Sequence, residues 1–462
     1  MKNNLWFLTE ERPKKEVLQT ILKKFIKDFG YVAVIRPLLI RPILKNGKFT
    51  FTYEVTGFEC NKVDNIYIKT VSGNSSFTDF LIFYQKNEPS VKDEPIYAIE
   101  ETKTDDKESR NTGVYQRCSK FVYIQSFYPK VKMIMLYNLQ VEQKIIPTST
   151  YIFGTKLLLT FGVEILGKNL DKDIFTPFKS IDEIIDLKNN MRKAPKGNVP
   201  ILLNKSKTKI EVSGRLFKSS GLSHDPNIGA LSIICAVLRQ LNWKEKIEIT
   251  QHGLEQNHVG KTNKFIQIAN KLDISLQNLI VPKAIMKNDY WKYDIDGEKL
   301  GTIFIHLVVE NFTNGYSIFE NHAGCEKGYF IPLKGEPIPL EKYKDKAKYK
   351  AGDKDQIVHI PDLILIDFER SEIINVEGKK YKFRQNGIDE LNNYDFIEKN
   401  YILKHYPKFK ILRTVVLFGG IEEKIIEVEI GFLLNENGKL ILGIKAPNIF
   451  KEAIKNLLDF WK

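Results

Sequence analysis

The sequence predicts a mixed α/β protein with two mixed sheets, each flanked by helices, joined by a mainly helical middle region. Short apolar runs typical of strands fill the chain from residue 31 to about 165 and return after residue 360. Runs of helical period stand beside them and fill the middle of the chain. At 462 residues, two or three domains are expected.

We expect an N-terminal domain over residues 1–185. It opens with a helix over 14–29, because Val17, Ile21, Leu22, Phe25 and Ile26 share one face, and Gly30 supplies a stop. Strands are expected at YVAVIRPLLIRPIL, FTFTYEVTGF, NIYIKTV, FTDFLIFY, IYAIEET, KMIMLYNL and LLLTFGVEIL.

A second helix is expected between the IYAIEET and KMIMLYNL strands. Residues 112–127 would turn Val114, Cys118, Phe121 and Val122 inward. The polar stretch 186–200, broken by proline and glycine, then predicts a linker.

The mainly helical region is expected over residues 201–295. Asp225 is a reasonable N-cap for a helix that starts at Pro226 and turns apolar at Ile228. The stretch 261–279 adds helical turns. This region has the size of a small DNA-binding or bridging module.

The C-terminal domain is expected over residues 296–462. An apolar run at 300–312 predicts a buried or helical segment, and a lysine-rich loop follows at 336–356. Two strands, a polar helical stretch at 386–405, a further strand, a hairpin and a closing helix complete the order.

The composition is that of a globular protein, with 43% hydrophobic and 27% charged residues. Its net charge of +13 suits a polyanionic partner such as nucleic acid, although lysine enrichment from an AT-rich genome gives the same bias. The four cysteines form no CxxC pair, which argues against a zinc ribbon or disulfide scaffold. No signal peptide or apolar span is recognisable, so a cytoplasmic protein that does not enter membranes is expected.

Two segments carry one arrangement of acids and lysine. Asp79 precedes a strand that ends on Glu101-x-Lys103, and Asp362 precedes a strand that ends on Glu377-x-Lys379. A Tyr-Pro-Lys step follows each glutamate after 27 or 29 residues. Roughly nine acid-x-base triplets are expected by chance at this composition, so the strand context carries the weight. Two carboxylates beside a lysine suit metal-dependent cleavage of a phosphodiester.

These residues, Asp79…Glu101-Thr102-Lys103 and Pro361-Asp362…Glu377-Gly378-Lys379, resemble the PD-(D/E)xK nuclease superfamily, especially its restriction endonucleases. The second copy has the full Pro-Asp form, whereas the first has Thr78 in place of the proline. The resemblance implies two restriction-endonuclease-like sheets. It also implies Mg²⁺ bound by the acids Asp79, Glu101, Asp362 and Glu377, with Lys103 and Lys379 positioning water. An additional helix glutamate often joins such sites, and Glu16 and Glu310 are candidates.

DNA contacts are expected just beyond each motif, because arginine and glutamine pair with base edges. The candidates are Arg110, Gln116, Arg117 and Lys120 after the first motif and Arg384 and Gln385 after the second. An ordinary solvated helix face is the alternative for each of them.

The sequence therefore predicts an endodeoxyribonuclease of the type II restriction class that hydrolyses DNA at a short double-stranded site with Mg²⁺. A structure-selective repair nuclease or resolvase, and a non-catalytic DNA-binding protein on a nuclease fold, are the alternatives. Double-stranded DNA is the expected partner. A homodimer and a cognate DNA methyltransferase of the same system are further partners to test.

Overall fold

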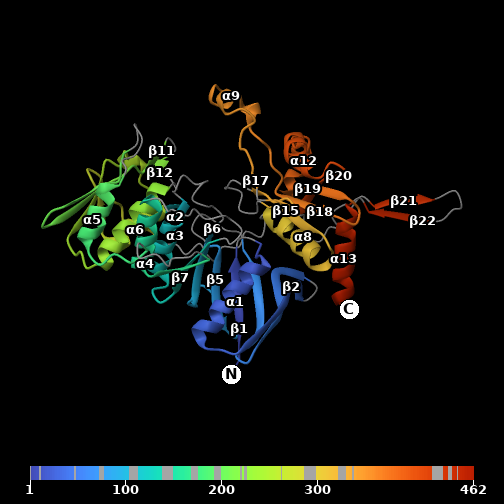
Figure 1. Ribbon diagram of the computed structural model, residues 1–462, viewed down its shortest axis with the longest axis horizontal. Coiled ribbons are helices and arrows are strands. Elements are labelled where there is room, and N and C mark those ends of the chain that lie inside the picture. Colours follow the sequence, from blue (N-terminus) through green and yellow to red (C-terminus); the bar gives the residue numbers. More distant parts are fainter. Residues whose placement is uncertain are drawn as a thin grey trace. The chain divides into compact units, whose positions relative to one another are not determined.

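The computed structural model divides into two compact units (Figure 1). Unit 1 combines Met1–Ser72 with Lys292–Lys462, and unit 2 is Gly73–Trp291. The structure describes residues 2–9, 12–45, 48–71, 78–102, 113–137, 149–167, 175–191, 199–218, 221–222, 226–261, 263–285, 298–320, 329–335, 338–418, 430–434, 440–444 and 446–461. Across these ranges, no helix has both the length and the apolar character to span a membrane.

The N-terminal part of unit 1 is a helix beside four strands in the order β2-β3-β4-β1. The bounds are β1 Asn3–Thr9, α1 Lys15–Phe29, β2 Ala33–Lys45, β3 Lys48–Cys60 and β4 Val63–Thr70. The helix predicted over 14–29 is confirmed. Gly30 ends it in the left-handed region (φ 64°) and donates its N–H to the carbonyl of Ile26, which closes the last turn.

The C-terminal part of unit 1 is built on the sheet β15-β18-β19-β20. β18 and β19 are antiparallel, whereas β19 and β20 are parallel and joined by a helical crossover. The sheet elements are α8 Glu298–Phe312, β15 Tyr316–Glu320, β18 Leu363–Asp367, β19 Glu372–Lys380, α10 Arg384–Leu391, α11 Asp395–Ile397, a π-helix Glu398–Ile402, α12 Leu403–His405, β20 Lys410–Phe418 and α13 Asn448–Trp461.

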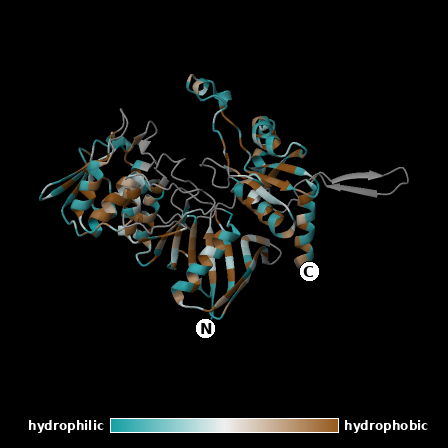
Figure 2. Ribbon diagram, in the orientation of Figure 1, coloured by the Kyte–Doolittle hydropathy of each residue, from teal (hydrophilic) through white to brown (hydrophobic). Residues whose placement is uncertain are grey.

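Shorter elements decorate this sheet: β16 Tyr329–Phe330, β17 Ile338–Pro339, α9 Lys346–Lys350 and the hairpin of β21 Ile430–Leu434 with β22 Leu440–Ile444. α8 and α13 bury one face of the sheet, and the crossover helices bury the other. β18 is apolar from Leu363 to Ile366 and ends on the buried Asp367, as suits a strand that is covered on both faces; the hydrophobic colour of the central strands is visible in Figure 2.

Contacts between the ends of the chain make unit 1 a single body. Arg12 forms ion pairs with Glu310 and Glu320, and the backbone N–H of Ile40 donates to Asn311 at 2.9 Å. These links run from the segment before α1 and from β2 to α8 and β15. The compact units therefore do not follow the boundaries 1–185 and 296–462 expected from the sequence, because residues 1–72 pack with the C-terminal part.

Unit 2 begins with four strands in the order β5-β6-β7-β8. β5 and β6 are antiparallel, and β6, β7 and β8 are parallel. The bounds are β5 Phe80–Gln85, β6 Tyr97–Thr102, α2 Gly113–Gln116, α3 Cys118–Phe127, β7 Lys132–Tyr137, α4 Ser149–Phe161 and β8 Val163–Leu166. The helix predicted over 112–127 is present as α2 and α3 with its predicted inward residues buried.

The expectation of one strand through LLLTFGVEIL was partly wrong. Its first five residues end helix α4, because Leu157, Leu158 and Phe161 continue a buried face of helical period that starts at Tyr151. Only the second half forms strand β8.

The expectation of a mainly helical region over 201–295 was also wrong. This segment carries the sheet β14-β13-β10-β9 together with the helices α6 and α7, which have 15 and 9 residues. The bounds are α5 Ile181–Asn190, β9 Leu203–Lys205, β10 Lys209–Ser213, β11 Phe217–Lys218, β12 Gly221–Leu222, α6 Pro226–Gln240, β13 Lys246–Thr250, α7 Lys264–Leu272 and β14 Ile274–Leu276. Short alternating segments such as KIEIT have strand period, which the longer helical runs obscured.

The region is not a separate module. α6 begins at Pro226 as expected, while Asp225 lies outside the described residues. α6 is buried on nearly every side and packs against α2, α3 and α4. The predicted linker also begins inside α5, which runs to Asn190 and is capped by the Ser180 side chain. Residues 192–198 of that stretch lie outside the description.

The chain is thus a mixed α/β protein with several mixed sheets and flanking helices. Both units contain the same local order: an antiparallel strand pair, a helical crossover and a parallel third strand. Each crossover ends in the predicted Tyr-Pro-Lys step. Tyr128 and Tyr406 are both buried there, and their backbone N–H groups donate to Ile124 and Ile402 at 2.9 and 2.8 Å.

Candidate active site

The register of β18 and β19 places the second motif's two acids on one face of the sheet. Leu363 pairs with Val376 in this antiparallel arrangement. Asp362, just before Leu363, is therefore opposite Glu377, just after Val376. The backbone N–H of Gly378 donates to Asp362 Oδ2 at 2.9 Å and fixes this carboxylate. The predicted pairing of Asp362 with Glu377 agrees with this geometry.

Glu377 is almost fully buried, and both of its oxygens are engaged. Lys379 Nζ lies 2.8 Å from Oε1, and the Tyr394 hydroxyl donates to Oε2. Burial raises the pKa of Glu377 to about 8, and Asp362 adds to the rise, while Lys379 and Tyr394 oppose it. A cation close to this carboxyl group would therefore strongly stabilise its ionised form.

Lys379 occupies the same face of β19 as Glu377, because residues two apart in a strand point the same way. Its Nζ lies 2.8 Å from Glu390 Oε2 on α10 as well as from Glu377. Burial lowers the pKa of Lys379, but its hydrogen bonds to Glu377 and Glu390 outweigh burial and hold the pKa above its ordinary value. Lys379 is therefore protonated, and its ammonium group lies between two acids as a hydrogen-bond donor.

Close packing of α10 on β19 positions this lysine. A Cβ at Gly387 would lie 2.7 Å from Lys379 Cγ and 3.0 Å from Val415 Cγ1, so only glycine lets the helix approach this far. Arg413 of β20 donates to Glu398 at 2.7 Å, and Glu398 also accepts from Asn375 at 2.7 Å. This buried network ties the π-helix to the sheet beside Glu377.

The first motif has the same register with one change. Phe80 pairs with Ile99, so the residue opposite Asp79 is Glu100 and not the expected Glu101. The N–H of the following residue, Glu101, donates to Asp79 Oδ2 at 2.6 Å, as that of Gly378 does to Asp362. Successive strand side chains point to opposite faces, which puts Glu101 on the other face from Asp79.

Glu100 has the environment that Glu377 has in unit 1. It is 0% exposed, and burial raises its pKa to about 8, with Asp79 adding to the rise and Lys120 and Arg117 opposing it. Lys120 Nζ lies 3.0 Å from Glu100 Oε1, and Arg117 Nε lies 3.6 Å from Oε2. The residue two positions after Glu100 is Thr102, so the amine beside this acid comes from helix α3 and not from the strand.

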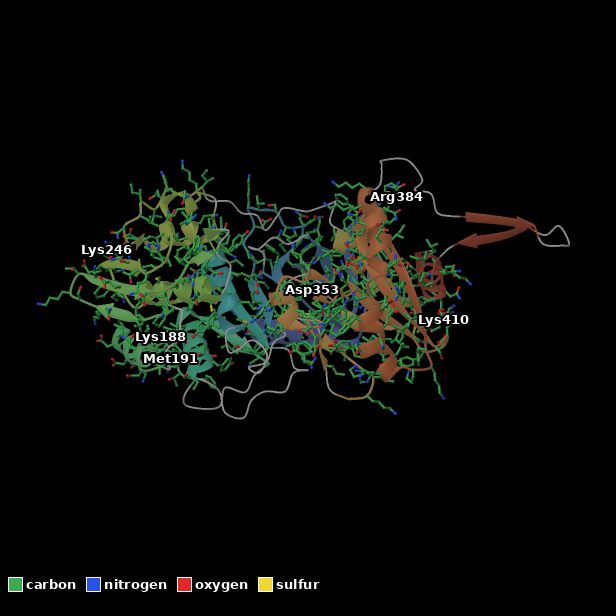
Figure 3. All side chains as sticks on the ribbon, turned by 90° about the horizontal axis from the view of Figure 1, so that it is seen from above. Lys188, Met191, Lys246, Asp353, Arg384 and Lys410 are labelled. Carbon is green, nitrogen blue, oxygen red and sulfur yellow. The ribbon has the colours of Figure 1, made fainter. Side chains whose placement is uncertain are left out.

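The other residues predicted for the sites fall in different places. Lys103 and Arg110 lie outside the described residues, as does the side chain of Gln116. Arg117 and Lys120 face Glu100, whereas Arg384, labelled in Figure 3, and Gln385 are exposed on α10.

Neither helix glutamate proposed from the sequence joins a centre within the described contacts. Glu16 is exposed on α1, and Glu310 pairs with Arg12 and His306. In unit 1 the residues of the helical crossover that do contact the centre are Glu390, which pairs with Lys379, and Tyr394, which donates to Glu377. Sequence reasoning missed them and the role of Lys120, because each reaches its centre from a crossover helix with no fixed spacing to the strand motif.

The residues present are suited to Mg²⁺. Each centre holds two facing carboxylates, and Mg²⁺ is commonly bound by one or two carboxylates with water and phosphate oxygens filling its shell. Among the described residues, no group of three or more His, Cys, Asp or Glu has metal-binding geometry. A cation at either centre would thus share its coordination with solvent and substrate.

No protein-family model, curated protein or solved structure matches this chain.

Proposed function

We propose that this protein is a Mg²⁺-dependent DNA endonuclease with restriction-endonuclease-like, PD-(D/E)xK-type centres. The observation that carries the proposal is the set in unit 1, where Asp362 faces Glu377 and the Lys379 amine lies 2.8 Å from Glu377. Burying Glu377 next to the half-buried Asp362 is costly unless the two acids bind a cation, which favours a functional role for this face.

Each residue of the unit 1 centre has a defined task. Asp362 and Glu377 would hold the Mg²⁺, which when bound supplies charge neutralisation on the phosphate and a more acidic water. Lys379 stays protonated, so it orients the attacking water and offsets charge on the phosphorane instead of acting as a base. The attacking water gives up a proton to solvent as its oxygen bonds to phosphorus, the bond from phosphorus to O3′ breaks, and O3′ takes a proton from a second water, which leaves 5′-phosphate and 3′-hydroxyl ends.

Unit 2 would carry a second centre made of Asp79, Glu100 and Lys120. Lys120 reaches Glu100 at 3.0 Å from helix α3, as Lys379 reaches Glu377 from its own strand. Two centres in one chain suit double-strand cleavage, with one centre for each strand. This supports an endonuclease of the type II restriction class acting on double-stranded DNA.

Incubation of the purified chain with supercoiled plasmid and Mg²⁺ tests the proposal. We expect discrete linear fragments on a gel, and Asp362→Asn should slow cutting by the unit 1 centre at least about 100-fold. Asp64→Asn, at an exposed position on β4 of the same unit, is the matched control and should cut normally. Intact plasmid with the unaltered chain across many DNA sequences would overturn the proposal, and cutting of branched DNA alone would replace the restriction class by a repair nuclease.

A second set of variants separates the two assignments in unit 2. Glu100→Gln and Lys120→Met should convert plasmid to nicked circles, because only the unit 1 centre still cuts. Glu101→Gln and Lys103→Met should leave linear products. The reverse pattern would restore the Glu101–Lys103 assignment.

A further inference from the structure

A lysine-rich arm stands away from the C-terminal sheet of unit 1. The arm comprises residues 341–358, with α9 at its tip, and Figure 1 shows α9 at the end of two adjacent stretches of chain. It carries lysines at every second position from 342 to 350, and all five are exposed: Lys342, Lys344, Lys346, Lys348 and Lys350.

The arm has a defined conformation of its own. Its two stretches are joined by backbone hydrogen bonds from Lys344 to Gln356 at 2.7 Å and from Val358 to Lys342 at 3.1 Å. The rings of Tyr343 and Tyr349 lie 4.3 Å apart between centroids. A surface held this way presents its charges at less entropic cost than a flexible loop does.

The arm is rooted at the face of the sheet that carries the unit 1 centre. Leu340 and Val358 are buried in the core beneath the crossover helices, and the N–H of Glu341 donates to the Tyr401 hydroxyl at 3.0 Å. The chain leaves the arm and reaches Asp362 four residues after Val358. The arm is thus attached directly beside Asp362.

The rest of unit 1 does not neutralise the five lysines of the arm through ion pairs within the described residues. None of the five lysines has an ion pair within the described part of the chain, where other lysines such as Lys209 and Lys246 are paired with Glu248. Asp345, the one acid between Lys342 and Lys350, accepts from the N–H groups of Ala347 and Lys348 at 2.8 and 3.1 Å and so caps α9. With Glu341, Asp353, Lys354 and Asp355 included, the arm has a net charge of +2. Five exposed like charges in nine residues repel one another and are relieved by a polyanion.

We propose that this arm binds the backbone phosphates of DNA next to the scissile bond held by the unit 1 centre. The inference rests on the proposed nuclease function, because it takes DNA as the ligand. Lysine contacts phosphate as a mobile point charge, and the two tyrosine rings are occupied with each other, so the arm contributes affinity without reading sequence.

Binding of a fluorescein-labelled DNA duplex to the full chain, measured by anisotropy without divalent ions at several salt concentrations, tests the arm. Lys346→Gln, Lys348→Gln and Lys350→Gln together should reduce the slope of log affinity against log salt by about 0.9 for each phosphate that is no longer neutralised, or roughly 2.7 for three. The decrease in affinity should be equal on unrelated DNA sequences. The triple Lys→Arg variant should bind like the unaltered chain, which separates charge from folding.

The matched control removes the same charge elsewhere. Lys207→Gln, Lys244→Gln and Lys271→Gln alter three exposed lysines of unit 2 and should leave the slope unchanged. An unchanged slope in the arm variant, with normal binding and cutting by the unaltered chain, overturns the arm inference alone. Absence of both DNA binding and cutting in the unaltered chain overturns the nuclease proposal itself.

Discussion

Replacing Glu100 by glutamine should stabilise the metal-free protein while it disables the unit 2 centre. Glu100 is fully buried beside Asp79, and burial raises its pKa from 4.5 to about 8. Glutamine has the shape of the protonated acid. The substitution therefore changes the free energy of the folded state little. The unfolded state, in contrast, loses the favourable ionisation of the glutamate.

The magnitude follows from the two pKa values. Between pH 4.5 and 8 the folded protein retains a proton that the unfolded chain has released. Stability thus falls as the pH rises through this window, by up to about 1.4 kcal/mol per pH unit. At pH 7 the penalty reaches about 3 kcal/mol. Lys120 keeps access to water because its side chain is 19% exposed, and Arg117 still donates to the Glu101 carbonyl at 3.0 Å, so a net gain of about 1–3 kcal/mol is expected.

Calorimetric unfolding of the full chain in chelator, between about pH 5 and pH 8, measures this effect. Glu100→Gln should raise the midpoint of the unit 2 transition by several degrees at pH 8 and by little at pH 5. Glu245→Gln, at an exposed position in the same unit, should change neither midpoint nor slope. A Glu100→Gln variant that is less stable than the unaltered chain at pH 8, with the same pH slope, would refute the burial argument.

Two further substitutions probe unit 1. Gly387→Ala inserts a Cβ 2.7 Å from Lys379 Cγ and should reduce cutting by the unit 1 centre about 10- to 100-fold, measured by plasmid nicking, whereas Gly260→Ala, with open space around its Cβ, should have no effect. Arg12→Met removes the cation paired with Glu310 and Glu320 and should cost about 3–5 kcal/mol in thermal unfolding at pH 7, against under about 1 kcal/mol for Arg36→Met at its exposed pair with Glu59. Burial raises the pKa of Glu310, but Arg12 and His306 lower it below its ordinary value. The loss of stability caused by Arg12→Met should therefore shrink as the pH falls below 4.5. A loss of stability that is independent of pH would contradict this account.

The local order of elements was largely readable from the sequence, because hydrophobic period reports on secondary structure. The helix ending at Gly30 and the strands of both motifs are where periodicity put them, and each Tyr-Pro-Lys step lies before a strand as noted in the sequence. The division into units was not readable. It depends on long-range contacts such as those from Arg12 to Glu310, which no local pattern encodes.

The candidate sites show the same division between local and long-range information. Glu377 and Lys379 share a strand, so their spacing was enough to pair them. The partner of Asp79 depends on how β5 and β6 align, and a shift of one residue exchanges Glu101 for Glu100. Two adjacent glutamates made both alignments equally plausible in the sequence.

The different origins of the two lysines are compatible with what the proposed nuclease chemistry requires. An amine must lie within hydrogen-bond reach of the buried glutamate, and neither its strand nor its spacing matters. Lys379 meets this condition from β19, and Lys120 meets it from α3, a helix that crosses the same face of its sheet. A Glu-x-Lys triplet is thus one solution among several. In unit 2 the register moves the triplet's glutamate to the other face, and a crossover lysine stands beside the acid that takes its place.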